Sequence, residues 1–153
     1  MKYKIPLFAL NFNHEEEIAL LDTLRSQWIS TGPKTTEFEN RFSELLGVRH
    51  SLALSNCTVS LHMAFEVLGI GENDEVICPS LTFVATVNAI RYVNAVPVFC
   101  DITSIENLNI DAEKIEKLIT EKTKAIMIMH YAGFACDMDR IVNIAKKHNL
   151  KII

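Results

Sequence analysis

Three short stretches of small polar, aromatic and imidazole side chains could do chemistry, and each follows an apolar run. The first, Ser55-Asn56-Cys57-Thr58, comes after Leu52–Leu54 and before apolar residues at helical spacing. A helix that begins there exposes unpaired N–H groups and the positive end of its dipole, and Thr58 adds a hydroxyl. The stretch therefore predicts an anion site of phosphate size at Cys57 and Thr58.

The other two stretches follow the apolar runs at 75–78 and 123–129. Phe83 lies in the turn after Pro79, and His130-Tyr131-Ala132-Gly133 closes the second run. Open α/β sheets bind ligands at the carboxyl ends of their strands, so we expect Phe83 to face a ligand pocket. The alternative for Phe83 is that it packs under the next helix as a core aromatic. For His130 and Tyr131, a pocket-lining role and a structural role both stay open.

Alternating strands and helices must position these residues. Asn13 caps a first helix, and Gly32-Pro33 ends helical structure in the loop Trp28–Lys34, which is either a connector or a part of the site. Thr35-Thr36-Glu37 caps the next helix, which Gly47 closes. We expect the following elements: strands at 48–54, 75–78, 95–101, 123–129 and from 150, and helices at 57–68, 82–92, after Asn109 or Asp111, and at 137–147. This order predicts an α/β fold, a three-layer, mostly parallel sheet with helices on both faces.

Composition and charge argue against several classes of protein, among them nucleic-acid-binding, membrane-spanning and secreted proteins. The 153 residues suit one domain, and the net charge of −4 provides no basic footprint for nucleic acid. No apolar run approaches membrane-spanning length, and the N-terminus lacks a signal-peptide pattern, so we expect a cytoplasmic protein. The four cysteines lack metal-ligand spacing and are expected to be reduced and mostly buried, with no metal site. Asp101, at a strand end, is interpreted as structural.

Taken together, the motifs resemble one known family. They are Ser55–Thr58, Asn73–Ile77 (NDEVI), Pro79–Thr86 (PSLTFVAT), Trp28–Pro33 (WISTGP) and His130–Gly133 (HYAG). In this combination the chain resembles the DegT-type sugar aminotransferases, enzymes that use pyridoxal 5'-phosphate (PLP) to aminate keto-sugars attached to nucleotides. Cys57 stands where the family has Gly or another small residue, so its side chain comes close to the expected phosphate.

The resemblance implies a fold and a set of site residues. It implies that residues 1–153 are the N-terminal part of the large domain of a fold-type-I PLP transferase, with an N-terminal arm, helix and loop in residues 1–34. It also implies a nucleotide-sugar substrate, an amino-acid donor such as glutamate, and a homodimer. The residues implied at the cofactor are Asn56, Cys57, Thr58, Phe83 and His130, and those implied on the substrate side are Thr31, Gly32 and Tyr131.

Alternatives remain at this point. In the family, the acid at the ring nitrogen and the Schiff-base lysine come after the position of Ile153, so the chain by itself is expected to contain no catalytic residue and to be inactive. It is then a non-catalytic fragment, and we expect an oligomer or a sheet that lacks Leu52–Leu54. A PLP-dependent sugar dehydratase of the same family, in which His replaces the lysine, is equally compatible. A Rossmann-type oxidoreductase is disfavoured because no G-x-G-x-x-G occurs.

Overall fold

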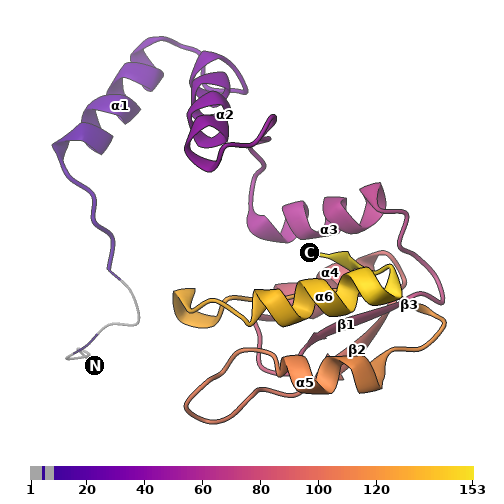
Figure 1. The fold of residues 1–153 in the computed structure, drawn as a ribbon. Helices are drawn as coiled ribbons and strands as arrows, with labels where there is room; N and C mark the ends of the chain where they lie inside the picture. Colours follow the sequence, from indigo (N-terminus) through magenta and orange to yellow (C-terminus); the bar gives the residue numbers. More distant parts are fainter. Residues whose placement is uncertain (1–4, 6–8) are drawn as a thin grey trace. The chain divides into compact units, whose positions relative to one another are not determined.

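The computed structural model describes residue 5 and residues 9–153 (Figure 1). Most of the expected N-terminal arm therefore lies outside the described residues. The chain divides into two compact units, Met1–Ala53 and Leu54–Ile153.

The described residues of the first unit form two helices. In α1 (His14–Arg25) Asn13 is the N-cap, as the sequence predicted, and its side chain accepts a hydrogen bond from the N–H of Glu15. The Glu16 carboxylate in turn accepts a hydrogen bond from the N–H of Asn13, which completes a capping box.

The second helix, α2 (Pro33–Leu46), begins before the predicted cap at Thr35-Thr36-Glu37. Gly32 is its N-cap and Pro33 its first residue, because a proline needs no N–H partner at this position. The predicted loop Trp28–Lys34 is therefore too long at its end, since Pro33 and Lys34 belong to α2.

The expected strand at 48–54 does not form. Side chains of α2 contact this segment instead. The Glu39 carboxylate accepts a hydrogen bond from the N–H of Ala53 at 2.9 Å, and the hydroxyl of Ser43 donates one to the hydroxyl of Ser51 at 2.9 Å. The sheet thus lacks Leu52–Leu54, which is one of the two outcomes expected above. An apolar run alone was not sufficient for a strand, because a strand needs a neighbouring strand to pair with.

The second unit is built on a parallel sheet of four strands, in the order β2-β1-β3-β4. The strands are β1 (Glu75–Pro79), β2 (Val96–Cys100), β3 (Thr123–Ile126) and β4 (Lys151–Ile152). β2 is an edge strand and contains Pro97, a residue that strand edges tolerate. β3 ends at Ile126 rather than at Met129, although the N–H of Met127 still bonds the carbonyl of Ile77.

Helices cover both faces of this sheet. The unit contains α3 (Cys57–Val67), α4 (Val84–Tyr92), α5 (Ala112–Ile115), the 3-10 turns η1 (Glu116–Leu118) and η2 (Tyr131–Gly133), and α6 (Met138–His148). Val76 and Cys78 of β1 pack in a buried cluster with Phe65 of α3 and Ile90 of α4. Ile77, which points to the opposite face, packs in a second cluster with residues of α5 and α6. The predicted three-layer α/β arrangement is confirmed.

Candidate functional site

The predicted site residues of the second unit lie at one edge of the sheet. α3 leads through a short turn into β1, so its first residue lies beside the carboxyl ends of the strands. α4 follows β1 directly, and η2 follows β3. The edge therefore brings together the first turn of α3, the turn before α4 and the loop that begins at His130.

The first turn of α3 has the geometry predicted for an anion site. Asn56 is the N-cap, and its side-chain oxygen accepts a hydrogen bond from the N–H of Val59 at 3.0 Å. Cys57 is exposed and Thr58 half-buried. Within the described residues, the N–H groups of Cys57 and Thr58 have no acceptor. The helix begins where the sequence predicted, and the binding of an anion there stays a prediction.

Phe83 is the N-cap residue of α4, and 69% of its surface is exposed. It does not pack under α4, so the alternative of a core aromatic was wrong. The neighbouring Thr82 holds this turn in place: its hydroxyl lies 2.8 Å from that of Thr86 and 3.5 Å from the sulfur of Met129. Since Met129 precedes His130, the turn that carries Phe83 lies next to the start of the His130 loop.

His130 begins a tight loop whose next residues form η2. The ring nitrogen Nδ1 of His130 accepts a hydrogen bond from the N–H of Cys136 at 3.1 Å, which leaves the ring proton on Nε2. Ala132 and Gly133 have φ angles of 52° and 86°, in the left-handed region that is costly for alanine. His130 is exposed and Tyr131 half-buried, so both side chains lie at the surface of this edge.

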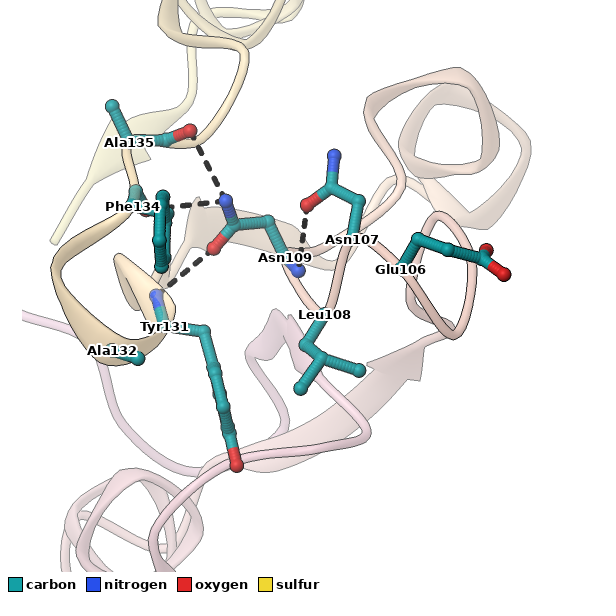
Figure 2. A pocket seen from close by; sticks show the side chains of 8 residues that line it. All are labelled: Glu106, Asn107, Leu108, Asn109, Tyr131, Ala132, Phe134 and Ala135. Carbon is teal, nitrogen blue, oxygen red and sulfur yellow. Dashed lines mark hydrogen bonds between the residues drawn. The ribbon is translucent and has the colours of Figure 1, made fainter.

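Asn109 is a residue of this edge that the sequence reasoning missed. Its side chain is 4% exposed and bonds only to the loop after His130 (Figure 2). The amide nitrogen donates to the carbonyl oxygens of Phe134 and Ala135, both at 3.1 Å, and the amide oxygen accepts from the N–H of Tyr131 at 2.9 Å. The sequence considered Asn109 only as a helix cap, but Asp111 is the cap of α5.

An open cavity of about 400 Å³ lies between the loops that Asn109 joins (Figure 2). One wall comes from residues 106–109, and the other from the loop after His130. The side chains of Leu108, Tyr131 and Phe134 contribute its apolar surface. The cavity does not include Thr58 or Phe83, so it is separate from the first turn of α3.

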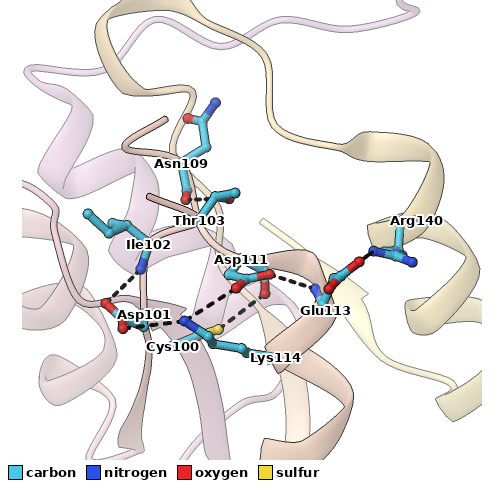
Figure 3. Close-up of polar contacts among 9 residues, drawn as sticks. All are labelled: Cys100, Asp101, Ile102, Thr103, Asn109, Asp111, Glu113, Lys114 and Arg140. Atoms are coloured by element: carbon cyan, nitrogen blue, oxygen red, sulfur yellow. Dashed lines mark hydrogen bonds and ion pairs between the residues drawn. The ribbon is translucent and has the colours of Figure 1, made fainter. Parts of the chain in front are cut away.

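Asp101 lies in a network of ion pairs at the end of β2 (Figure 3). Its carboxylate accepts from the N–H of Ile102 at 2.9 Å and lies 3.4 Å from the ammonium of Lys114, which also contacts Asp111 at 3.3 Å. The backbone hydrogen bond from Ile102, followed by the charge of Lys114, lowers the pKa of Asp101. These contacts join β2 to α5, in agreement with the structural role expected for Asp101.

Three of the four cysteines are buried, as predicted. Burial raises the pKa of Cys78 to about 12 and that of Cys100 to about 11, so both thiols stay protonated and unreactive. In the described residues, no group of three or more His, Cys, Asp and Glu side chains gathers as metal ligands do. None of the described helices is both long and apolar enough to cross a membrane.

Thr31 and Gly32, predicted on the substrate side, belong to the first unit. The indole N–H of Trp28 donates to the carbonyl of Thr31 at 3.0 Å. A Cβ atom on Gly32 would clash with the Trp28 indole ring, so any other residue here would displace that ring. The contact fixes the Trp28 ring on the first turn of α2, and a role toward substrate stays a prediction.

Comparison with known proteins gives consistent matches. Residues 11–153 match the DegT/DnrJ/EryC1/StrS aminotransferase family. The chain is 42% identical over 151 residues to a GDP-perosamine synthase of Caulobacter vibrioides, a match that covers 98% of this chain and 40% of the relative. It is 40% identical over 153 residues to the spore coat polysaccharide biosynthesis protein SpsC of Bacillus subtilis, and this match covers 100% of this chain and 38% of the relative. The chain thus spans about two fifths of the length of these relatives.

Solved structures agree with these matches. An aminotransferase from Psychrobacter cryohalolentis superposes with a TM-score of 0.87 at 37% identity, over 93% of this chain and 36% of that protein. NtdA from Bacillus subtilis, solved with bound cofactor PMP, superposes with a TM-score of 0.86 at 33% identity, over 92% of this chain and 33% of that protein.

Proposed function

Because the chain belongs to the DegT/DnrJ/EryC1/StrS aminotransferase family, we propose that it forms the N-terminal part of the large domain of a PLP-dependent aminotransferase that acts on a nucleotide-linked keto-sugar. In this proposal residues 1–34 are the arm, helix and loop that precede the domain's core. The whole enzyme would work as a cytoplasmic homodimer with an amino-acid donor such as glutamate.

The first turn of α3 is the observation that carries the proposal. The N–H groups of Cys57 and Thr58 have no acceptor in the described residues, and the helix dipole places positive charge at the same point. Phosphate is the group of PLP that such a terminus binds, and the Thr58 hydroxyl adds a donor. Asn56 contributes by fixing the turn, since its side-chain oxygen is bonded to the N–H of Val59.

Other residues of the same edge would hold the rest of the cofactor. Phe83 is exposed and free to stack on a pyridine ring, and His130 presents the proton on Nε2 because its Nδ1 is bonded to the N–H of Cys136. When bound, PLP supplies the electron sink that carbanion chemistry at an amino-bearing carbon needs. The residues of this chain would orient the cofactor and keep its phosphate in place.

The nucleotide-sugar substrate is inferred from the relatives, among which is a GDP-perosamine synthase. Thr31, Gly32 and Tyr131 are proposed on the substrate side. The net charge of −4 means that the negative nucleotide diphosphate must be held by local donors and not by the field of the whole chain.

The phosphate site is tested by the substitution Thr58→Val. We expect the chain to bind PLP, and the variant to bind it with about 1–2 kcal/mol less free energy, as for a lost hydrogen bond to a charged group. Fluorescence titration with PLP, and with pyridoxal as the phosphate-free comparison, measures this difference. Thr36→Val, in the first turn of α2, is the matched control and should leave PLP affinity unchanged. Equal affinities for PLP and pyridoxal would contradict the assignment.

The stacking role is tested by Phe83→Ala. Since 69% of Phe83 is exposed, its loss should leave the thermal midpoint of the cofactor-free chain within about 2 °C. PLP affinity should fall by about 0.5–1.5 kcal/mol, the range for aromatic pairs. A large fall in thermal stability with unchanged PLP affinity would identify Phe83 as a structural residue.

The reaction itself is tested on the 153-residue chain alone and on the complete enzyme of which we propose it to be the N-terminal part. With L-glutamate and nucleotide-linked keto-sugars, we expect the complete enzyme to form 2-oxoglutarate in a way that depends on PLP, and the 153-residue chain alone to form none. PLP binding by the complete enzyme without transfer to any member of a set of keto-sugars would contradict the aminotransferase proposal.

A further inference from the structure

We propose that Asn109 is a positioning residue: its buried amide holds the loop His130–Ala135 in the shape that sets His130 and Tyr131 at the site edge. The inference rests on the proposed function, in which PLP binds at the edge of the sheet where His130 lies. It assigns a role to a residue that lies about 20 positions before the loop it controls and contacts no predicted ligand.

The chemistry of the contact requires an amide. Asn109 donates to two carbonyl oxygens, those of Phe134 and Ala135, and accepts from one N–H, that of Tyr131. Aspartate would keep the acceptor but would direct a negative oxygen at two carbonyl oxygens. An apolar residue would leave all three backbone groups without their partner.

Asn109 is itself held by the chain segment that follows β2. Its N–H donates to the side-chain oxygen of Asn107 at 3.2 Å, and its carbonyl accepts from the N–H of Thr103 at 3.0 Å. The next residue, Ile110, is 2% exposed and pairs with Ile102 in an antiparallel bridge just after β2. The amide is therefore a rigid point of attachment.

The loop that Asn109 holds needs such an attachment. Ala132 adopts a φ of 52°, which a side chain disfavours, and Gly133 follows with a φ of 86°. The hydrogen bond from the N–H of Cys136 to Nδ1 of His130 closes the loop from its other end. A loop released by Asn109 would relax at Ala132, and the His130 ring would lose its fixed orientation.

The test compares Asn109→Asp with Asn107→Asp. Both add one negative charge to the same loop, but Asn107→Asp keeps the oxygen that accepts from the N–H of Asn109, and its amide nitrogen makes no hydrogen bond in the described residues. Residue-resolved hydrogen exchange and the imidazole NMR signals of His130 are measured on the cofactor-free chain, and PLP affinity is measured by titration.

We expect Asn109→Asp to speed amide exchange at residues 131–136 at least tenfold, to move the His130 signals, and to weaken PLP binding at least threefold. Asn107→Asp should change none of these, and exchange in β1 should be the same in both variants. Unchanged amide exchange at residues 131–136 would overturn the inference. An equal rise in exchange throughout the second unit would also overturn it, because that result would show that Asn109 only stabilises the fold as a whole. A released loop with unchanged PLP affinity would also overturn it.

Failure of the proposed function has a different signature. If the unaltered chain binds no PLP, the proposed function fails, while loop exchange in the two variants still decides whether Asn109 positions His130 and Tyr131. Should Asn109→Asp not fold, Asn109→Ser shortens the side chain, removes the same three hydrogen bonds without adding charge, and is compared with the unaltered chain.

Discussion

The two compact units of the chain form their helices by the same local rules but differ in what those helices pack on. In the first unit, α1 has a complete capping box and α2 has proline at its first position, yet neither helix has a buried residue. In the second unit, α3, α4 and α6 each bury side chains against the sheet. Local signals specify where a helix begins, whereas a core requires partners from distant parts of the sequence.

The largest expected effect comes from the second unit's core. Ile77→Ala removes a side chain that is 0% exposed between Ile126 and the residues of α5 and α6. Loss of transfer energy and the cavity left behind should lower the free energy of unfolding by about 2–5 kcal/mol, measured by urea denaturation. Ile29→Ala makes the same change in the first unit, where the side chain is 79% exposed, and should cost less than about 0.5 kcal/mol. An equal loss of unfolding free energy in both variants would contradict the proposed difference between the two units.

A smaller effect is expected at the helix caps, and it sharpens the comparison. Asn13→Ala and Asp137→Ala each remove an N-cap and should each cost about 1 kcal/mol of helix stability. In α1 the remaining stability is local, so hydrogen exchange should show the whole helix opening more often. In α6, which buries Ile141 and Ile144, exchange should rise only in the first turn. Equal protection of both helices would contradict this difference.

The sequence was sufficient for elements that depend on near neighbours. The caps at Asn13 and Asp111, the start of α3 after Asn56, and the order of strands and helices in the second unit follow from residues within one or two turns. The same reasoning placed Pro33 and Lys34 in a loop, although a proline suits the first position of a helix, where its missing N–H needs no partner. It also predicted a strand at 48–54, where no pairing partner is present in the structure.

The candidate site was predictable to a similar extent. Cys57, Thr58, Phe83 and His130 were found because each follows a strand or opens a helix, and strand ends in a parallel sheet meet at one edge. Asn109 was not found, since its amide bonds residues 22 to 26 positions further along the chain. A buried asparagine among apolar neighbours carries no periodic signal that distinguishes it from a turn residue.

The smallest expected effect concerns ion pairs, which also differ between the units. In α2, Glu37 pairs loosely with Lys34 and Arg41 of its own helix, at 3.9 and 3.7 Å. In the second unit, Glu116 of η1 contacts Lys147 and His148 of α6 at 2.6 and 2.8 Å, so its pairs join two elements.

Hydrogen bonds from His148 and Lys147 lower the pKa of Glu116 from 4.5 to about 2. A pKa that is lower in the folded state contributes stability above the unfolded value, and this contribution disappears as the pH falls from 4.5 to about 2. Glu116→Gln should therefore be less stable than the unaltered chain at pH 7, and the two unfolding curves should converge near pH 2. Because Glu116 is exposed, the difference should be small and should shrink further at high salt. Glu37→Gln, whose ion pairs stay within one helix, should leave the acid unfolding of the second unit unchanged. A difference between Glu116→Gln and the unaltered chain that persists undiminished at pH 2 would show that the carboxylate acts through packing and not through its charge.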